Sequence, residues 1–164
     1  MNLVLIGLPG AGKSTVGKAV AQCLHLPFFD CDDAVTEAAG KSIPAIFAQE
    51  GEQGFRRRET DCLRELLKKS SCVIAAGGGA VVSQENRQML HGAKAVFLDR
   101  SPDEIMSTFE TEGRPLMAAH TLQELSDARR QFYLEAADFT VAESTIEAAT
   151  ESIINWWRKY SCTF

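Results

Sequence analysis

The chain has 164 residues, of which 45% are hydrophobic and 24% are charged, and its formal net charge is −5. This composition is typical of one globular domain and excludes a disordered, collagen-like or coiled-coil chain. No apolar run approaches the ~20 residues of a membrane span, and the acidic balance disfavours a broad nucleic-acid surface, which needs a basic footprint.

Short apolar runs alternate along the chain with amphipathic stretches. The apolar runs predict five strands, at residues 3–6, 26–32, 72–76, 93–98 and 138–141. Helical periodicity predicts four helices, at residues 13–24, 52–69, 102–109 and 145–160. Strands that alternate with helices indicate an α/β fold with a parallel sheet and crossover helices. We expect residues 1–164 to form a single domain.

A phosphate-binding loop follows the first predicted strand. Residues 7–14 read G-L-P-G-A-G-K-S and match G-x-x-x-x-G-K-[ST] without a mismatch. The glycines let backbone N–H groups converge at the start of the next helix, where an anion is favoured. A plain glycine-rich turn is the alternative. The predicted ATP-binding residues are Gly10, Ala11, Gly12, Lys13, Ser14 and Thr15, with Lys13 on the terminal phosphates and Ser14 on magnesium.

Two carboxylates end the second predicted strand. Asp30 and Asp32 are two residues apart, so a strand would point them to the same face, at the end that meets the ligand crevice. One could support a magnesium ion, and the other could accept a hydrogen bond from an acceptor hydroxyl. Alternatively, an aspartate caps the next helix, and Asp33 suits that role well.

Arginines and glycines follow in the middle of the chain. Arg56, Arg57 and Arg58 would span about 200° of a helix, so at most two can face one site, and Glu59 could pair with an inward one. The glycines at 77–79 follow a strand and leave room for a ligand carboxylate to approach the backbone, although a tight turn is the alternative.

Further arginines lie toward the C-terminus. Residues 113–121 resemble a mobile loop, and Arg114 within it could stabilise a transferring phosphoryl group. Arg129 could clamp an anion, with Arg130 as its rival, and each has an alternative as a surface residue.

The motifs together resemble the shikimate kinase family. They are, in order, G-L-P-G-A-G-K-S-T, F-F-D-C-D-D, S-I-P-A-I-F, G-E-Q-G-F-R-R-R-E, A-G-G-G-A-V, R-P-L-M and R-R-Q-F-Y-L-E-A-A-D. The resemblance implies a three-layer P-loop kinase fold with a five-stranded parallel sheet flanked by helices. It also implies transfer of the ATP γ-phosphoryl group to the 3-hydroxyl of shikimate, a step of aromatic amino-acid biosynthesis.

The resemblance also implies roles for single residues. Lys13, Asp32 and Arg114 would be catalytic, with Asp32 as general base and Arg114 closing over ATP. Shikimate would be held by Asp32, Arg56, Gly78 and Arg129. One Mg²⁺ per subunit would be held by Ser14 and, through water, by Asp30. Residues 31–60 would form the substrate-binding helices, and residues 112–123 the lid.

The chain departs from the family pattern around the nucleotide base. The stretch 101–113 has no basic residue, whereas the family often places an arginine there against adenine, and Phe109 is our candidate replacement by stacking. The segment after Val141 also lacks the Pro or Arg that often completes this pocket, and the R-x-P-L-Y motif has lost its proline.

Two other functions compete with this interpretation. One is another small-molecule kinase, acting on gluconate or a nucleoside monophosphate, and the other is a non-enzymatic nucleotide-binding module. The expected partners are small molecules only, without nucleic acid or membrane, and the expected state is a monomer. Five cysteines, an odd number without a C-x-x-C pair, and the absence of a visible signal peptide indicate a cytoplasmic location.

Overall fold

The computed structural model describes residues 1–112 and 119–161, and the side chains of 1–108 and 121–160. Five parallel strands form one sheet in the order β2-β3-β1-β4-β5. The α/β prediction and the five-stranded parallel sheet are therefore confirmed. The strands are β1 (Leu3–Ile6), β2 (Phe28–Asp30), β3 (Val73–Ala75), β4 (Lys94–Leu98) and β5 (Phe139–Val141).

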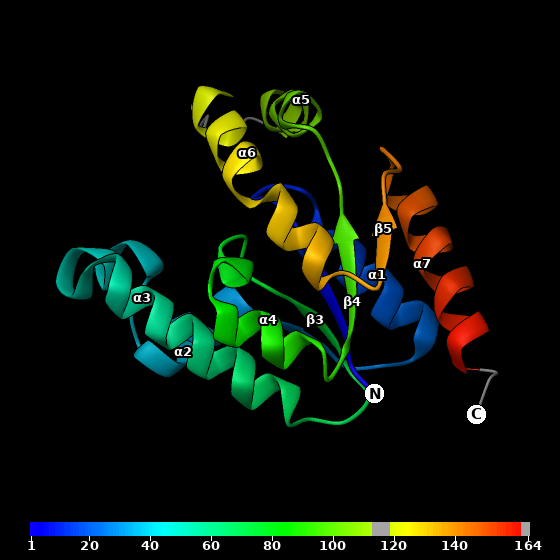
Figure 1. Cartoon of the computed structure of the whole chain (residues 1–164), viewed down its shortest axis with the longest axis horizontal. Coiled ribbons are helices and arrows are strands. Elements are labelled where there is room, and N and C mark those ends of the chain that lie inside the picture. Colours follow the sequence, from blue (N-terminus) through cyan, green and yellow to red (C-terminus); the bar gives the residue numbers. More distant parts are fainter. Residues whose placement is uncertain (113–118, 162–164) are drawn as a thin grey trace.

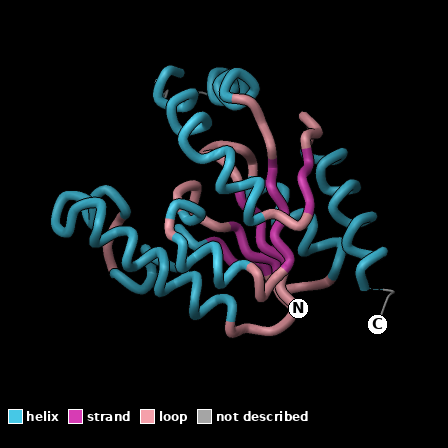
Figure 2. Tube along the Cα trace, in the orientation of Figure 1, coloured by secondary structure: helices cyan, strands magenta, loops and turns pink. Residues whose placement is uncertain are grey.

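Helices cover both faces of the sheet, as Figures 1 and 2 show. On one face α1 packs against α7, and on the other α4 and α6 lie beside the short 3-10 helix η1. The helices are α1 (Lys13–Leu24), α2 (Cys31–Ala39), α3 (Ile43–Leu67), α4 (Gln84–Leu90), α5 (Pro102–Glu112), α6 (Ala119–Ala136) and α7 (Ile146–Ser161), with η1 at Ala80–Val82.

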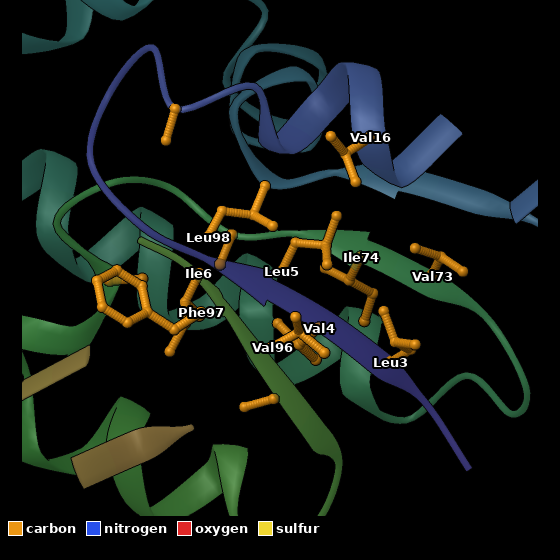
Figure 3. Packing of buried hydrophobic residues seen from close by; sticks show 14 of the residues in the cluster. Leu3, Val4, Leu5, Ile6, Val16, Val73, Ile74, Val96, Phe97 and Leu98 are labelled. Carbon is orange, nitrogen blue, oxygen red and sulfur yellow. The ribbon is translucent and has the colours of Figure 1, made fainter. Parts of the chain in front are cut away.

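The core lies around β1, the central strand. All four β1 residues are buried, because helices cover both faces of a parallel sheet. Figure 3 shows their side chains between those of the neighbouring strands β3 and β4. In the order of the sheet, β2 and β3 lie on one side of β1, and β4 and β5 lie on the other. The connections that leave β1 and β3 therefore run to opposite sides, and a switch point forms beside the end of β1. Ligands of open α/β sheets bind at such a point.

The largest difference from prediction lies after β2. The strand ends at Asp30, and Asp32 lies in the first turn of α2 instead of on a strand, because the Asp30 carboxylate caps this helix. Asp30 Oδ1 accepts a hydrogen bond from the Asp32 backbone N–H at 2.9 Å. The prediction that Asp33 suits the cap is therefore wrong, and so is the strand geometry predicted for Asp30 and Asp32.

Helix α3 is longer than predicted and is bent. The predicted start at residue 52 falls just after Gly51, whose φ of 69° and ψ of −176° interrupt the helix. Helical periodicity did not predict the helical segment before Gly51, which only the family resemblance implied within residues 31–60, and it did not predict α4 or α6. Residues 119–121, predicted as part of a mobile loop, belong to α6. Among the described residues, no helix is both long and apolar enough to cross a membrane.

Candidate active site

A cleft of about 560 Å³ opens where the strands end. Its walls come from the loop between β1 and α1, the start of α2, the middle of α3, the turn after β3 and the middle of α6. The predicted site residues that line it are Gly10, Gly12, Lys13, Ser14, Thr15, Asp30, Asp32, Arg56, Gly78 and Arg129. Ala11, which is part of the same loop, is buried and does not line this cleft.

The predicted phosphate loop has the required local geometry. Gly10 and Gly12 have φ of +78° and +89°, in the left-handed region that favours glycine. Gly12 is also the N-cap of α1, so the first N–H groups of α1 have no partner within the helix and border the cleft. A helix N-terminus with free amides attracts an anion. The arrangement therefore supports binding of phosphate groups.

The ammonium group of Lys13 lies inside this loop. Its Nζ donates hydrogen bonds to the carbonyl oxygens of Gly7 at 3.0 Å and Leu8 at 2.8 Å. Burial lowers the pKa of Lys13 to about 8, although the carboxylates of Asp32, Asp30 and Glu59 oppose that shift. Lys13 thus places a positive charge beside the α1 N-terminus.

Ser14 and Asp30 meet at the floor of the cleft. Ser14 Oγ donates a hydrogen bond to Asp30 Oδ2 at 2.5 Å. A hydroxyl and a carboxylate are the hard oxygen donors that Mg²⁺ prefers. Within residues 1–112 and 119–161, no cluster of three or more His, Cys, Asp or Glu side chains could hold a metal by itself. The donor set fits an ion that completes its shell with phosphate oxygens and water.

Asp32 reaches the cleft from the first turn of α2, not from a strand. It lines the same cavity as Ser14, Asp30 and Arg56, and its carboxylate feels the charges of Asp30, Lys13 and Arg56. Burial, followed by the nearby charge of Asp30, raises the pKa of Asp32, while Lys13 lowers it. Asp30 and Asp32 thus line the same cleft as predicted, but they do so because Asp30 caps α2 and Asp32 lies in its first turn.

One of the three consecutive arginines faces the cleft. Arg56 Nη1 donates to Glu59 Oε2 at 2.8 Å, and Glu59 is only 2% exposed. Arg57 is exposed, and Arg58 donates two hydrogen bonds to Glu50. Burial raises the pKa of Glu59 even though Arg56 lowers it. The predicted inward arginine with a Glu59 partner is confirmed as a contact.

The turn after β3 is held by α6. Arg129 Nη1 donates to the Gly78 carbonyl oxygen at 3.2 Å, and the Tyr133 hydroxyl donates to the same oxygen. Arg130 instead forms two hydrogen bonds with Asp99, each 2.8 Å long, away from the cleft. The choice between the two arginines, which the sequence leaves open, falls on Arg129. Tyr133 itself was not predicted, because only the fold of α6 turns it toward Gly78.

Sequence reasoning also missed Arg100, two residues beyond β4. Its Nη2 donates to Thr108 Oγ1 at 3.3 Å, and both residues line the cleft. Its place after a strand, at the ligand edge of the sheet, was a usable signal. Arg114, predicted to be catalytic and to contact ATP, lies outside the described residues, and so does the Phe109 side chain.

Comparisons with known proteins agree on one family. A family model described as "Shikimate kinase" matches residues 9–158. The chain is 44% identical over 146 residues to a shikimate kinase of Cupriavidus pinatubonensis, covering 85% of this chain and 76% of that protein. It is also 39% identical over 137 residues to a bifunctional shikimate kinase/3-dehydroquinate synthase of Thermotoga maritima, covering 82% of this chain but only 28% of that longer protein.

A solved structure is similar over nearly the whole chain. It is a shikimate kinase from Acinetobacter baumannii in complex with shikimate. The similarity has a TM-score of 0.89 at 33% sequence identity and covers 97% of this chain and 93% of the other.

Proposed function

The chain belongs to the shikimate kinase family, and from this premise we propose how the residues of its cleft share the reaction. The chain is an ATP-dependent small-molecule kinase whose activity is transfer of the γ-phosphoryl group of ATP to shikimate. One observation supports the division of roles: a phosphate loop and a pair of arginines, Arg56 and Arg129, line the same cleft.

The nucleotide side consists of the phosphate loop and the first residues of α1. Its amides and Lys13 bind the phosphate groups of ATP, because free N–H groups and a cation converge there. We assign one Mg²⁺ to Ser14 and Asp30, whose oxygens fit it. When bound, Mg²⁺ neutralises charge on the phosphates and orients them.

The acceptor side must hold a small carboxylate with three hydroxyl groups. Arg56 and Arg129 provide guanidinium groups for the carboxylate, which they can bind through charge-assisted hydrogen bonds. Asp32 lines the same cleft, near the charges of both Lys13 and Arg56, and accepts the proton of the 3-hydroxyl as general base. Gly78, whose carbonyl is already taken by Arg129 and Tyr133, contributes its backbone N–H.

The remaining assignments come from the family alone. Arg114 closes over ATP and stabilises the charge of the transferring phosphoryl group, within a lid at residues 112–123, and residues 31–60 form the acceptor-binding helices. We propose that one chain suffices for activity, since it furnishes both sides of the cleft. A cytoplasmic location suits the free thiols of Cys23, Cys31, Cys62 and Cys72.

Release of ADP from ATP and Mg²⁺ tests the proposal. Shikimate should stimulate release strongly, and gluconate, quinate and AMP should not. Stimulation by another acceptor would keep the roles of the phosphate loop and overturn those of Arg56 and Arg129. ATP binding without turnover on any acceptor would instead favour a binding module.

A further inference from the structure

The turn formed by Gly77, Gly78 and Gly79 contacts cleft side chains at the three places where a Cβ would stand. A Cβ at Gly77 would lie 2.2 Å from Glu59 Oε1, and one at Gly79 would lie 2.2 Å from Arg56 Nη1. A Cβ at Gly78 would lie 2.7 Å from Cδ of Pro9 in the phosphate loop. Each distance is too short for real atoms. Gly78 leaves room for Pro9 and Gly79 for Arg56, and Gly77 leaves room for Glu59, with Asp32 Oδ1 also 3.3 Å from the added Cβ.

The backbone conformation does not explain these glycines. None of the three has the positive φ that favours glycine, whereas Gly10 and Gly12 do. Gly79 has φ of −99° and ψ of −2°, which residues with side chains also adopt. The requirement for glycine at the turn is therefore a requirement for space.

The space at Gly79 is filled by the whole guanidinium group of Arg56. Its Nη1, Cζ and Nη2 atoms would lie 2.2, 2.5 and 2.5 Å from the added Cβ. The space at Gly77 is filled by the Glu59 carboxylate, which holds Arg56 from the other side at 2.8 Å. Both members of the Arg56–Glu59 pair thus lie against the turn, Arg56 with its whole guanidinium group and Glu59 with one carboxylate oxygen.

We propose that Gly77 and Gly79 are positioning residues that hold the Arg56–Glu59 pair in place for the acceptor carboxylate. This inference rests on the proposed role of Arg56. It differs from the sequence-based interpretation, in which the glycines keep the backbone open to the ligand. In the present interpretation the missing side chains make room for protein groups, and a methyl group at Gly79 acts through Arg56.

Gly78 has a different neighbour and should respond differently. Its added Cβ would meet the ring and the backbone nitrogen of Pro9, at 2.7 to 2.9 Å, and backbone cannot move as freely as the end of a side chain. Gly78→Ala should therefore disturb the phosphate loop and weaken ATP binding, whereas Gly77→Ala and Gly79→Ala should leave ATP binding near the wild-type value.

A double-mutant cycle tests whether Gly79 leaves room for the Arg56 guanidinium or for the ligand itself. Gly79→Ala and Arg56→Ala should each weaken shikimate binding, measured by calorimetry, by about tenfold to a hundredfold, the range for hydrogen bonds to charged groups. The double variant should bind no more weakly than Arg56→Ala alone, because the methyl group then has no guanidinium to displace. The KM for shikimate should rise in Gly79→Ala, with kcat and the KM for ATP little changed.

Additive losses in the double variant, or wild-type binding by Gly79→Ala, would overturn the inference. Gly92→Ala is the matched control, because its Cβ would lie 3.3 Å from only one backbone oxygen, that of Met89. If Gly79→Ala does not fold, Gly77→Ala with Glu59→Ala forms an equivalent cycle.

A crystal structure of Gly79→Ala tests the inference without reference to the substrate. The guanidinium of Arg56 should leave the turn, and an unmoved Arg56 would contradict the proposal whatever the acceptor proves to be. If the wild-type chain does not bind shikimate but Arg56 is displaced in this variant, the proposed function fails while the positioning role stands.

Discussion

The two sides of the cleft are built in different ways. The phosphate-binding part of the nucleotide side comes from one continuous stretch, residues 7–15, and its geometry depends on backbone torsions, such as those of Gly10 and Gly12. The acceptor side gathers α2, α3, the turn after β3 and α6, and its geometry depends on contacts between side chains and distant backbone. A local site tolerates change elsewhere, whereas a composite site moves when any supporting element moves.

The largest effect is expected on the nucleotide side. Lys13→Met removes the cation that lies inside the phosphate loop, so turnover should fall by about 10²–10³, as when one preorganised donor is lost. Calorimetry should show a much smaller effect on shikimate binding, because Lys13 makes its hydrogen bonds within the phosphate loop and acts on Asp32 only through its charge. A parallel loss of shikimate binding would show that the two sides are not independent.

The acceptor side should bind shikimate more weakly when Arg129, which α6 contributes to it, is removed. Arg129→Ala should raise the KM for shikimate by about tenfold to a hundredfold, since a charged donor is lost, while the Tyr133 hydroxyl still donates to the Gly78 carbonyl. The neighbouring Arg130→Ala is the matched control, because Arg130 pairs with Asp99 away from the cleft. Steady-state kinetics with both variants decides the comparison, and equal effects would contradict the assignment of Arg129.

A smaller effect is expected from Glu59→Gln, which keeps an acceptor for Arg56 but removes its charge. The KM for shikimate should rise less than tenfold, because the hydrogen bond from the charged Arg56 remains and loses only the negative charge of its acceptor. Whereas shikimate binding weakens, the stability of Glu59→Gln relative to the wild type should increase as pH rises. Burial raises the pKa of Glu59, so the folded chain binds this proton more tightly than the unfolded chain, and the wild type loses stability as pH rises.

Thermal unfolding at several pH values measures that second effect. The melting temperature of Glu59→Gln relative to wild type should increase as pH rises above about 4, where an exposed glutamate begins to ionise, because the buried carboxyl of the wild type must then lose its proton at a cost. A difference that stays constant with pH would show that Glu59 is not destabilised by burial.

The contrast between the two sides also explains what could be predicted from the sequence. The phosphate loop was predicted residue by residue, because its motif, strand and helix are contiguous. On the acceptor side the predicted residues Asp32, Arg56, Gly78 and Arg129 line the cleft, and their roles stay predictions. The predicted geometry of Asp32 was wrong, because the Asp30 side chain caps α2 and ends the strand before Asp32. Neither the choice of Arg129 over Arg130 nor the contacts of Tyr133 follow from local pattern, since both depend on the placement of α6.

The smallest effect is expected from the bend in α3, which supports the acceptor side from a distance. Gly51 joins two helical segments that pack back on each other, with Phe47 and Phe55 stacked 4.6 Å apart across the bend. Its φ of 69° and ψ of −176° fall in a region almost restricted to glycine. Gly51→Ala should therefore lower stability by about 1–3 kcal/mol, equivalent to a fall in melting temperature of roughly 2–4 °C per kcal/mol.

This substitution also shows how the acceptor side is supported. The small buried cluster of Val35, Ile46 and Phe55 connects α2 with both segments of α3, so strain at Gly51 should reach Phe55 and Arg56 before it reaches the phosphate loop. The KM for shikimate should rise while the KM for ATP stays constant, and Gly92→Ala should change neither. A melting temperature equal to that of the wild type would mean that the bend relaxes in solution. Equal changes in both KM values would mean that the two sides of the cleft share one support, and the contrast between a local and a composite site would then fail.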